Sequence, residues 1–242
     1  MSISFDSHTH TVMSGHAFST IEEYAAACSR YGLEGFATTD HGPAMMGAPQ
    51  LIYFYNLASL PRQVNGIRVL RGVEANIVGI DGSLDLPDPV LKRLDVCIAS
   101  YHEIVLPPKT AGEHTAAWLS VIKNPFVDIV GHSGRGPFPF DIHAVLKACR
   151  DENKAIEINN HTVSGDSFPH NCRDIALACR KLGVKIVVNS DAHISSNVGQ
   201  VADALAMLAT VDFPMELIVN RTFASFWQWL SERKPWLTLG ED

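Results

Sequence analysis

The sequence predicts an α/β protein whose parallel strands close, or nearly close, into a barrel. Short β-type runs alternate along the whole chain with helical segments of about 10–15 residues, a pattern typical of βαβ units around a parallel sheet. Seven such units follow one another without a linker rich in Gly, Ser or Pro. Polar residues end almost every strand-like run. An open doubly wound sheet is the structural alternative.

The first three units follow from local patterning. Short β-type runs predict strands over residues 3–7, 35–39 and 68–73. Helices are expected over residues 20–31, where Ser19 or Thr20 is a suitable N-cap, and over residues 49–64. The turn Asp81-Gly82 after the third strand indicates a small hairpin insertion.

The rest of the chain repeats this alternation. Strands are expected over residues 95–100, 127–131, 155–159 and 184–189. Helices are expected over residues 88–94, 113–123, 141–153, 169–182, 198–209 and 222–233. Asp141 is a suitable N-cap for its helix. The helix over 169–182 carries an apolar face made of Ile175, Ala178, Cys179 and Leu182.

Length and composition narrow the class of protein. The 242 residues fit one large α/β barrel or two small domains, and we expect a single domain over residues 1–242. Apolar residues make up 46% of the chain, which is enough for a sizeable core. A formal charge of −7 disfavours a protein that coats nucleic acid.

The same features predict a cytoplasmic location. No apolar run is long enough for a membrane span, and the first residues lack the pattern of a signal peptide. The five cysteines are odd in number and form no C-x-x-C pair. We therefore expect reduced thiols that serve mostly as buried packing residues.

Histidines and carboxylates gather at the predicted strand ends. The seven expected strands run into DSHTH, TTDHG, GVEAN, ASYHE, VGHSG, EINN and NSDAH. A parallel barrel places the carboxyl ends of all its strands on one face, where the βα loops build the active site. Side chains that are far apart in the sequence are thereby expected to share one rim.

The spacing of these residues suits metal ions. Residues i and i+2 of an extended segment point the same way, so His8 and His10 can approach one ion together. Asp191 and His193 have the same spacing. The pattern disfavours a cloning tag, because tags are uninterrupted His runs.

Two carboxylates have distinct expected roles. Glu74 ends its strand as an isolated carboxylate that can bridge two cations, and Asp40 can orient the imidazole of its neighbour His41. The number of these residues decides between a structural role and a metal site. One histidine at a strand end is most often a structural residue. Many imidazoles and carboxylates buried together without a cation would instead leave buried charges unpaired, and this would destabilise the fold. We therefore predict a metal site.

The ordered set H-T-H-T, T-D-H-G, G-V-E, Y-H-E, G-H and S-D-A-H resembles the PHP family, named for polymerase and histidinol phosphatase. The stretches HAFSTIEEYAAACSRYGLEGFATTDHGPAM, LRGVEANIVGIDGSLD, EINN and VVNSDAH are most similar to its YcdX-like phosphatase branch. The resemblance covers essentially the whole chain in order. It implies a distorted (β/α)7 barrel, TIM-barrel-like, that hydrolyses phosphoesters with three divalent metal ions, commonly zinc.

The resemblance also implies how the ions are held. The three sets of ligands are His8, His10, Glu74 and Asp191; then Glu74, His102 and His132; then His16, His41 and His193. Seven imidazoles and two carboxylates without a thiolate suit zinc, iron(II) or manganese. One departure from the family is Ser133, where relatives usually have proline after the histidine.

The implied mechanism is metal-assisted hydrolysis of a small phosphomonoester. Glu74 would bridge two ions about 3.5–4 Å apart, with a metal-bound hydroxide as the nucleophile. Glu74 and Asp191 are thus expected catalytic residues, and His161 or a metal-bound water is expected to protonate the leaving group. Arg135 is a candidate phosphate contact or an ordinary loop residue. His114 and His143 are expected at the surface or as helix caps.

Two other functions remain open at this stage. An amidohydrolase-like enzyme would also use an early H-x-H and a late Asp, but it generally needs a bridging Lys, and no Lys lies at an expected strand end. A metal-stabilised interaction module with little turnover is the second alternative. The expected partner is a small phosphorylated substrate, with neither membrane nor nucleic acid. Family analogy implies a homo-oligomer, and a trimer is the expected state.

Overall fold

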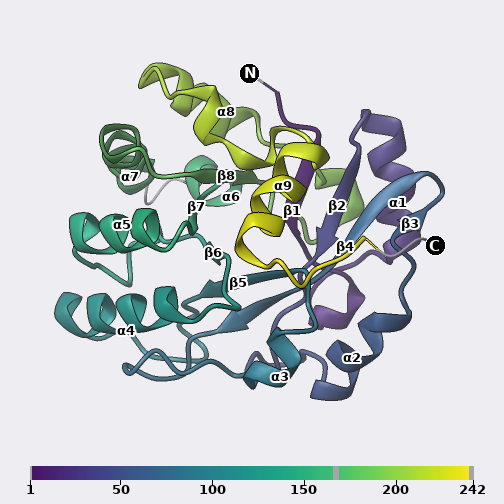
Figure 1. Ribbon diagram of the computed structural model, residues 1–242, viewed down its shortest axis with the longest axis horizontal. Coiled ribbons are helices and arrows are strands. Elements are labelled where there is room, and N and C mark those ends of the chain that lie inside the picture. The colour runs from purple at the N-terminus through teal and green to yellow at the C-terminus, as the bar shows by residue number, and fades with distance from the viewer. Residues whose placement is uncertain (1, 166–168, 240–242) are drawn as a thin grey trace.

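The computed structural model describes residues 2–165 and 169–239 (Figure 1). Seven parallel strands of this part form one sheet in the order β1-β2-β4-β5-β6-β7-β8. Their bounds are β1 Phe5–Thr9, β2 Gly35–Thr38, β4 Ile67–Asn76, β5 Val96–Ser100, β6 Ile129–Val130, β7 Ala155–Asn159 and β8 Ile186–Asn189. The predicted barrel is confirmed, because this sheet curls until its two end strands meet.

The seam between β1 and β8 is what distorts the barrel. Just beyond the carboxyl ends of these strands, the His10 N–H donates to the Ala192 carbonyl over 2.8 Å. Along the strands themselves, the Asn220 side chain lies between β1 and β8. Its Nδ2 donates to the carbonyls of Phe5 (3.0 Å) and Val188 (2.8 Å), and its Oδ1 accepts from the Val188 N–H (2.9 Å). A side-chain amide therefore replaces part of the strand ladder.

Helix α9 (Phe223–Arg233) closes the amino-terminal mouth of the barrel and lies across the strands in Figure 1. Thr222 begins it with a capping box, accepting from the Ser225 N–H. Its side chains Phe226, Trp229 and Leu230 form one apolar cluster with the inward-facing strand residues Phe5, Ala37, Leu70, Val96, Ile98, Ile129, Ala155 and Val187. Apolar packing thus fills this end, and polar side chains collect at the other.

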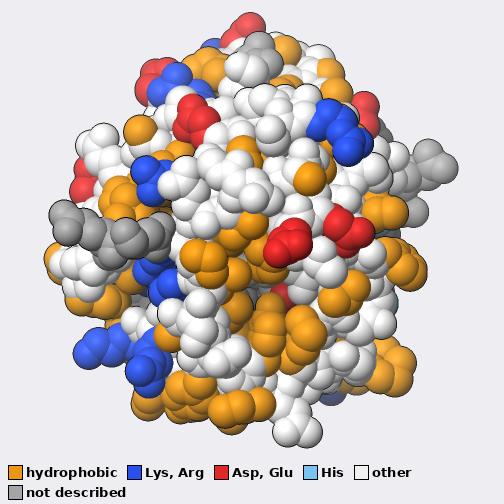
Figure 2. All heavy atoms as spheres, turned by 90° about the vertical axis from the view of Figure 1, so that its right-hand side faces the viewer, with side chains coloured by type: hydrophobic (Ala, Val, Ile, Leu, Met, Phe, Trp, Pro, Cys, Tyr) orange, Lys and Arg blue, Asp and Glu red, His pale blue; other side chains and the backbone are white. Residues whose placement is uncertain are grey.

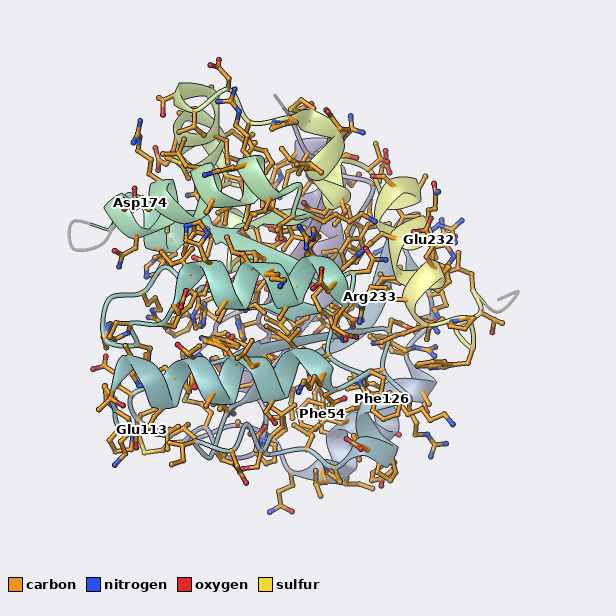
Figure 3. The ribbon with its side chains drawn as sticks, turned by 60° about the vertical axis from the view of Figure 1, so that its left-hand side comes forward. Phe54, Glu113, Phe126, Asp174, Glu232 and Arg233 are labelled. Carbon is orange, nitrogen blue, oxygen red and sulfur yellow. The ribbon has the colours of Figure 1, made fainter. Side chains whose placement is uncertain are left out.

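The remaining helices cover the outside of the barrel. They are α1 Ile21–Tyr31, α2 Leu51–Asn56, α3 Asp88–Leu91, α4 Ala111–Lys123, α5 Ile142–Asp151, α6 Asn160–Ser164, α7 Pro169–Leu182 and α8 Ala202–Thr210. Figure 3 shows α4, α5 and α7 side by side on one flank. The predicted caps Thr20 and Asp141 are confirmed, since each side chain accepts from a backbone N–H of the first helical turn.

Short 3-10 turns occupy several of the loops. Their bounds are η1 Val12–Ser14, η2 Leu57–Ser59, η3 Ser195–Asn197, η4 Met215–Leu217 and η5 Val219–Arg221. The predicted hairpin at Asp81-Gly82 is confirmed, because Ile77 and Leu84 form an antiparallel bridge around it. Gly82 has φ +82°, which favours glycine there.

The predicted helix over residues 49–64 is wrong in its second half. Helix α2 ends at Asn56, and β3 (Gln63–Val64) pairs antiparallel with the start of β4. Pro61 disfavours a helix at this point, since it has no N–H to donate and restricts the residue before it. Asn65 and Gly66 both have positive φ, as a tight hairpin turn requires.

Several expected boundaries also differ from the structure. The first strand, expected over 3–7, is Phe5–Thr9, and the third, expected over 68–73, extends over Ile67–Asn76. The helix expected over 198–209 is the shorter α8, preceded by η3. The five cysteines are buried thiols, as expected. No helix in the described part of the chain is both long and apolar enough to cross a membrane.

Candidate metal centre

A local irregularity in β1 turns its histidines into the barrel. Phe5 faces the barrel interior, so His8, three residues later, would face outward in an unbroken strand. The register of β1 against β2 shifts between Asp6 and Thr9, and this shift reverses the alternation. His8 and His10 consequently both point inward, with their Nε2 atoms 3.0 Å apart. The predicted approach of the H-x-H pair is confirmed.

Left-handed backbone conformations aim two further side chains. His132 after β6 has φ +20°, and Asp191 after β8 has φ +56°. Such conformations in residues other than glycine cost about 1–3 kcal/mol each and persist where the surroundings fix them. The His132 N–H donates to Glu157 Oε2 over 2.7 Å, which holds that turn in place.

Glu74 lies at the middle of the cluster. Its chain position on β4 continues the inward-facing series that starts with Leu70, and the side chain is 1% exposed. The ring nitrogens that face its Oε1 are His132 Nε2 at 2.8 Å and His102 Nε2 at 3.4 Å. Those that face its Oε2 are His41 Nδ1 at 2.8 Å, His8 Nε2 at 3.4 Å and His10 Nε2 at 3.4 Å.

Asp191 forms the second carboxylate of the cluster. Its Oδ1 lies 3.1 Å from His10 Nε2 and 3.5 Å from His8 Nε2. His193 Nδ1 is 3.7 Å from the same oxygen, and its Nε2 is 3.0 Å from His16 Nε2. The structure therefore brings all nine predicted ligand residues into one cluster.

Hydrogen bonds fix which nitrogen of His10 faces the cluster. Its Nδ1 lies 3.0 Å from Ser14 Oγ, and that hydroxyl donates to Asp40 Oδ1 over 2.7 Å. Ser14 therefore accepts the Nδ1 proton of His10, because its own proton is already committed. In the neutral ring, the lone pair of Nε2 then points at Glu74 and Asp191.

His102 has the same arrangement. Its Nδ1 lies 2.8 Å from Asn76 Oδ1, and the Asn76 amide is oriented by donation from Nδ2 to the Gly42 carbonyl over 3.1 Å. The Nε2 lone pair of neutral His102 therefore faces Glu74 Oε1. Lone pairs aimed at carboxylate oxygens repel one another unless a cation lies between them.

Two buried polar atoms also indicate that a cation binds in the cluster. His41 Nδ1 and Asp191 Oδ1 are buried and have no hydrogen-bond partner among the residues that the structure describes, although the first lies 2.8 Å from Glu74 Oε2. Buried polar atoms are otherwise almost always bonded. Imidazole and carboxylate donors that converge in this way fit divalent cations such as zinc.

The charge states suit cation binding. Burial raises the pKa of Glu74, but the neighbouring His102, His8 and His41, in their protonated forms, outweigh burial and lower it well below its usual value. Burial together with the neighbouring His41 lowers the pKa of His10 well below its usual value. Near neutral pH the chain thus offers an ionised carboxylate and a neutral imidazole, the forms that bind metal ions.

His8 is the exception. Burial lowers the pKa of His8, but the carboxylates of Glu157, Asp191 and Glu74 outweigh burial and raise it well above its usual value. The His8 Nδ1 proton faces Glu157 Oε1 at 2.7 Å, so an additional proton would sit on Nε2, at the centre of the cluster. A proton there takes the place that a cation would occupy.

Glu157 has a role in the cluster that the motifs at the strand ends did not predict. This carboxylate is 2% exposed and also accepts from Asn189 Nδ2 over 2.8 Å. A signal was present, because Ala155, Glu157 and Asn159 alternate on the inward face of β7. The expected role of Asp40 was wrong: it reaches the ring of His10 through Ser14 instead of the ring of His41.

The cluster opens into a pocket of about 470 Å³. Its lining includes His16, His41, Glu74, His102, His132, Asp191 and His193, with Met45, Arg135, His161, Ser190 and Asn197 around them. His161 therefore reaches the pocket from α6, as the sequence suggested, while its role as an acid stays a prediction. His8 and His10 are completely buried beneath the pocket.

The two histidines expected outside the site behave differently. His143 is exposed, as expected. His114 is completely buried, so the expectation of a surface residue was wrong. Its Nε2 accepts from the Lys109 N–H over 2.8 Å and its Nδ1 donates to the Pro139 carbonyl over 2.8 Å. This ring therefore joins two loops, a contact that its helical position does not reveal.

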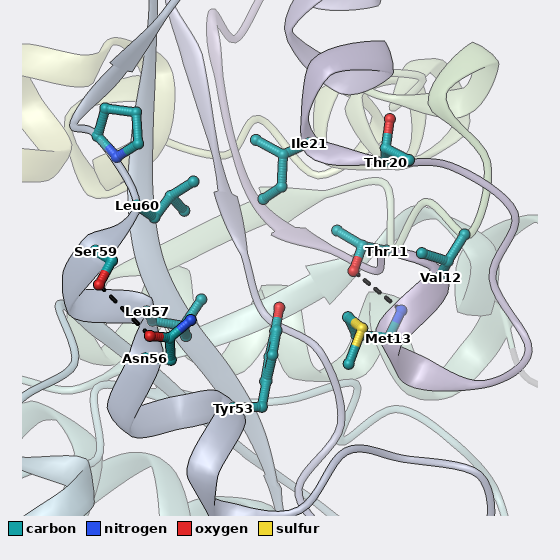
Figure 4. A pocket seen from close by; sticks show the side chains of 11 residues that line it. Thr11, Val12, Met13, Thr20, Ile21, Tyr53, Asn56, Leu57, Ser59 and Leu60 are labelled. Atoms are coloured by element: carbon teal, nitrogen blue, oxygen red, sulfur yellow. Dashed lines mark hydrogen bonds between the residues drawn. The ribbon is translucent and has the colours of Figure 1, made fainter.

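A second pocket, of about 370 Å³, lies beside η1 (Figure 4). Its walls include Val12, Met13, Ile21, Leu57 and Leu60, and no imidazole, carboxylate, thiol or cation lines it within the described residues. Figure 2 views the flank that carries α1 and β3, where hydrophobic side chains gather in the middle of the face. This pocket lacks groups for chemistry and is not the candidate site.

A barrel with an open His/carboxylate cluster at the carboxyl ends of its strands is the architecture of metal-dependent hydrolases. A PHP domain model matches residues 6–132. Proteins named probable phosphatases are 46% identical in Acetivibrio thermocellus, over 95% of both chains, and 42% identical in Caldicellulosiruptor saccharolyticus, over 95% of this chain and 97% of that one. The chain belongs to the PHP-domain family, and the phosphatase class expected from the sequence is confirmed.

A solved structure shares the fold. It is the histidinol phosphate phosphatase of Lactococcus lactis subsp. lactis, crystallised with zinc, L-histidinol and phosphate. The TM-score is 0.65 at 18% sequence identity, over 88% of this chain and 95% of that one. At this identity the likeness establishes the barrel and leaves the substrate of this chain to be argued from its own residues.

Proposed function

We propose that this phosphatase hydrolyses a small phosphomonoester at a centre of three divalent cations held by the nine clustered side chains. One observation carries the proposal: Glu74 and Asp191 face ring nitrogens whose lone pairs, in His10 and His102, are directed at carboxylate oxygens. Cations between these atoms remove the repulsion. The zinc in the structurally similar phosphatase supports the same proposal.

The cluster contains three groups of donor atoms, and the atoms of each group lie within 4.8 Å of one another. They are His8 with His10 and Asp191, His41 with Glu74 and His102, and His10 with His41 and His193. The first group contains three of the four residues in the first set implied by the family resemblance. The second group has His41 where the resemblance implies His132, and the third has His10 where it implies His16. In the other two implied sets, His132 would join Glu74 and His102, and His16 would join His41 and His193. We propose zinc because nitrogen-rich sites favour it over manganese.

The chain's own residues prepare the site. Divalent cations bound here would supply Lewis acidity and lower the pKa of water to about 7. Glu157, Ser14 and Asn76 hold the rings of His8, His10 and His102 through their Nδ1 atoms, so that each Nε2 is already aimed. Preorganised ligands of this kind avoid rearrangement during the reaction.

The residues that line the pocket above the cluster determine which substrate can bind. The substrate's phosphoryl group would bind where Glu74 and Asp191 help to hold the cations, and His161, which also lines the pocket, would donate a proton to the departing alcohol. No Lys lines the pocket within the described residues, so the bridging Lys of an amidohydrolase has no counterpart there. Hydrolysis of a phosphomonoester is the function that the site supports best.

Elemental analysis combined with a phosphoester panel tests the proposal. We expect about three equivalents of zinc per chain and turnover of phosphomonoesters above that of phosphodiesters and amides. Fully metallated protein without turnover would instead support an interaction module, and selective amide hydrolysis would support an amidohydrolase. The trimer suggested by family analogy stays a prediction, which light scattering can test.

A further inference from the structure

One guanidinium lies at the mouth of the metal pocket. Arg135 follows β6, and its backbone N–H donates to the His132 carbonyl over 3.0 Å, so the loop turns directly above a predicted ligand. Its side chain makes no hydrogen bond or ion pair with any residue that the structure describes. It is also the one Lys or Arg among the described residues that line the pocket.

A smaller hollow adjoins the metal pocket at Arg135. It measures about 180 Å³ and shares Met45, His102 and Arg135 with the larger pocket. Its other walls are Tyr101, Glu103, Ile104, Pro137 and Phe138. Ile104 is 61% exposed, Phe138 stacks on Tyr101 at 4.6 Å, and Glu103 is the one acidic side chain among these residues and is exposed to solvent. A benzene molecule fits a cavity of about 150 Å³, so the volume of this hollow is enough for one ring that lies against Met45, Ile104 and Phe138.

We propose that Arg135 binds the phosphoryl oxygens of the substrate and directs its leaving group into this hollow, which selects phosphomonoesters whose alcohol carries an apolar ring. The inference rests on the proposed function and names the substrate class of that same site. A guanidinium presents two parallel N–H donors that match two phosphoryl oxygens, which fixes orientation as well as position. Met45, Ile104 and Phe138 then cover part of the ring surface and shield it from water.

Charge in the pocket supports the assignment. Glu74 and Asp191 line it, and the chain as a whole carries a formal charge of −7. In the metal-loaded site the proposed cations would balance the phosphoryl oxygens that face the cluster, whereas the carboxylates around them would not attract the oxygens that point away. Among the described residues that line the pocket, Arg135 is the one Lys or Arg. It can therefore bind the phosphoryl oxygens that point away from the cluster.

The phosphate contact is tested with Arg135→Gln in the zinc-loaded protein. We expect KM for a phosphomonoester and the inhibition constant for inorganic phosphate to rise about tenfold to a hundredfold, because hydrogen bonds to a charged group are lost. Zinc content and the far-UV circular dichroism spectrum should stay unchanged. Arg135→Lys should recover part of the loss, and the exposed Arg150→Gln serves as the control.

Either of two results would overturn this contact. One is an inhibition constant for phosphate within twofold of the unmodified protein, and the other is a fall in kcat with KM and phosphate inhibition unchanged. Failure of the proposed function looks different, since the unmodified zinc-loaded protein would then hydrolyse no phosphomonoester. In that case calorimetry still measures the affinity for inorganic phosphate in the unmodified protein and in Arg135→Gln, so the contact at Arg135 is tested without turnover.

The hollow is tested with benzyl phosphate and ethyl phosphate, two alkyl esters with similar intrinsic reactivity. We expect kcat/KM to favour the benzyl ester at least about tenfold, since apolar contacts of this size discriminate on that order. Ile104→Asn should reduce the preference, whereas Ile52→Asn, which is also exposed and lies outside both pockets, should retain it. Equal rates for the two esters, or a preference that survives Ile104→Asn, would overturn the subsite.

Discussion

Glu157 accepts a hydrogen bond from the ring of His8, with 2.7 Å between Oε1 and Nδ1, at the buried base of the metal centre. Its other oxygen accepts from the His132 N–H over 2.7 Å. One carboxylate on β7 thus orients ligands from two other strands. Burial raises the pKa of Glu157, but His8 outweighs burial and lowers it below its usual value, so the carboxylate is ionised when it does so.

Replacing Glu157 should weaken metal binding without removing a ligand. Glu157→Gln loses the charge that favours the His8 tautomer, and its amide can accept at one position only. We expect zinc affinity to fall about tenfold to a hundredfold, as is usual when the residue behind a ligating histidine is changed. Competition with a chelator measures this. Glu22→Gln on the exposed side of α1 should leave the affinity unchanged, and an unchanged affinity in Glu157→Gln would remove Glu157 from the site.

Asn220 should be important for the stability of the barrel. Asn220→Ala leaves the Phe5 carbonyl and the backbone of Val188 without the bonds that join β1 to β8. Each buried group left unsatisfied costs about 1–3 kcal/mol, so we expect the free energy of unfolding to fall by about 3 kcal/mol or more. Urea denaturation measures it, with the exposed Asn56→Ala as a control. A loss below about 1 kcal/mol would mean that the seam is held by other contacts.

Lys154 should make stability depend on pH. Burial, and then the nearby Arg233, lower the pKa of Lys154 from 10.5 to about 7. The folded protein therefore binds fewer protons than the unfolded chain between about pH 7 and pH 10.5, and stability contributed by Lys154 rises with pH across that window. The slope is at most about 1.4 kcal/mol per pH unit.

The Lys154 prediction is checked with urea unfolding at pH 7 and pH 9. We expect the free energy of unfolding of the unmodified protein to increase between pH 7 and pH 9 by more than that of Lys154→Met. Arg233, labelled in Figure 3, also bonds to Asp128 at this end of the barrel, so the variant leaves that ion pair in place. Identical pH profiles for the two proteins would contradict the assignment.

Much of the site could be predicted because the barrel fixes where strands end. Parallel strands place His8, Glu74 and Asp191 on one face whatever the details of the loops, and this was sufficient to predict the cluster. Alternation along β7 also contained the signal for Glu157. The Asn65-Gly66 pair marked a hairpin turn in the stretch that was expected to be helical throughout.

Other features depend on contacts between distant segments. The register shift in β1 that turns His8 inward, and the positive φ of His132 and Asp191, arise where neighbouring strands and loops fix the backbone. Asn220 joins β1 to β8 across more than half of the chain, and nothing near it in the sequence indicates this role. The relay from Asp40 through Ser14 to His10 likewise appears only when the fold brings the three together.

The central claim is that Glu74 holds cations at the middle of the cluster, and Glu74→Gln tests it most directly. Zinc content and phosphomonoester turnover are measured together, with the exposed His143→Ala as the matched control. We predict that Glu74→Gln loses at least one equivalent of zinc and that kcat falls at least about a hundredfold, while His143→Ala retains both. Full zinc content with undiminished turnover in Glu74→Gln would contradict the account.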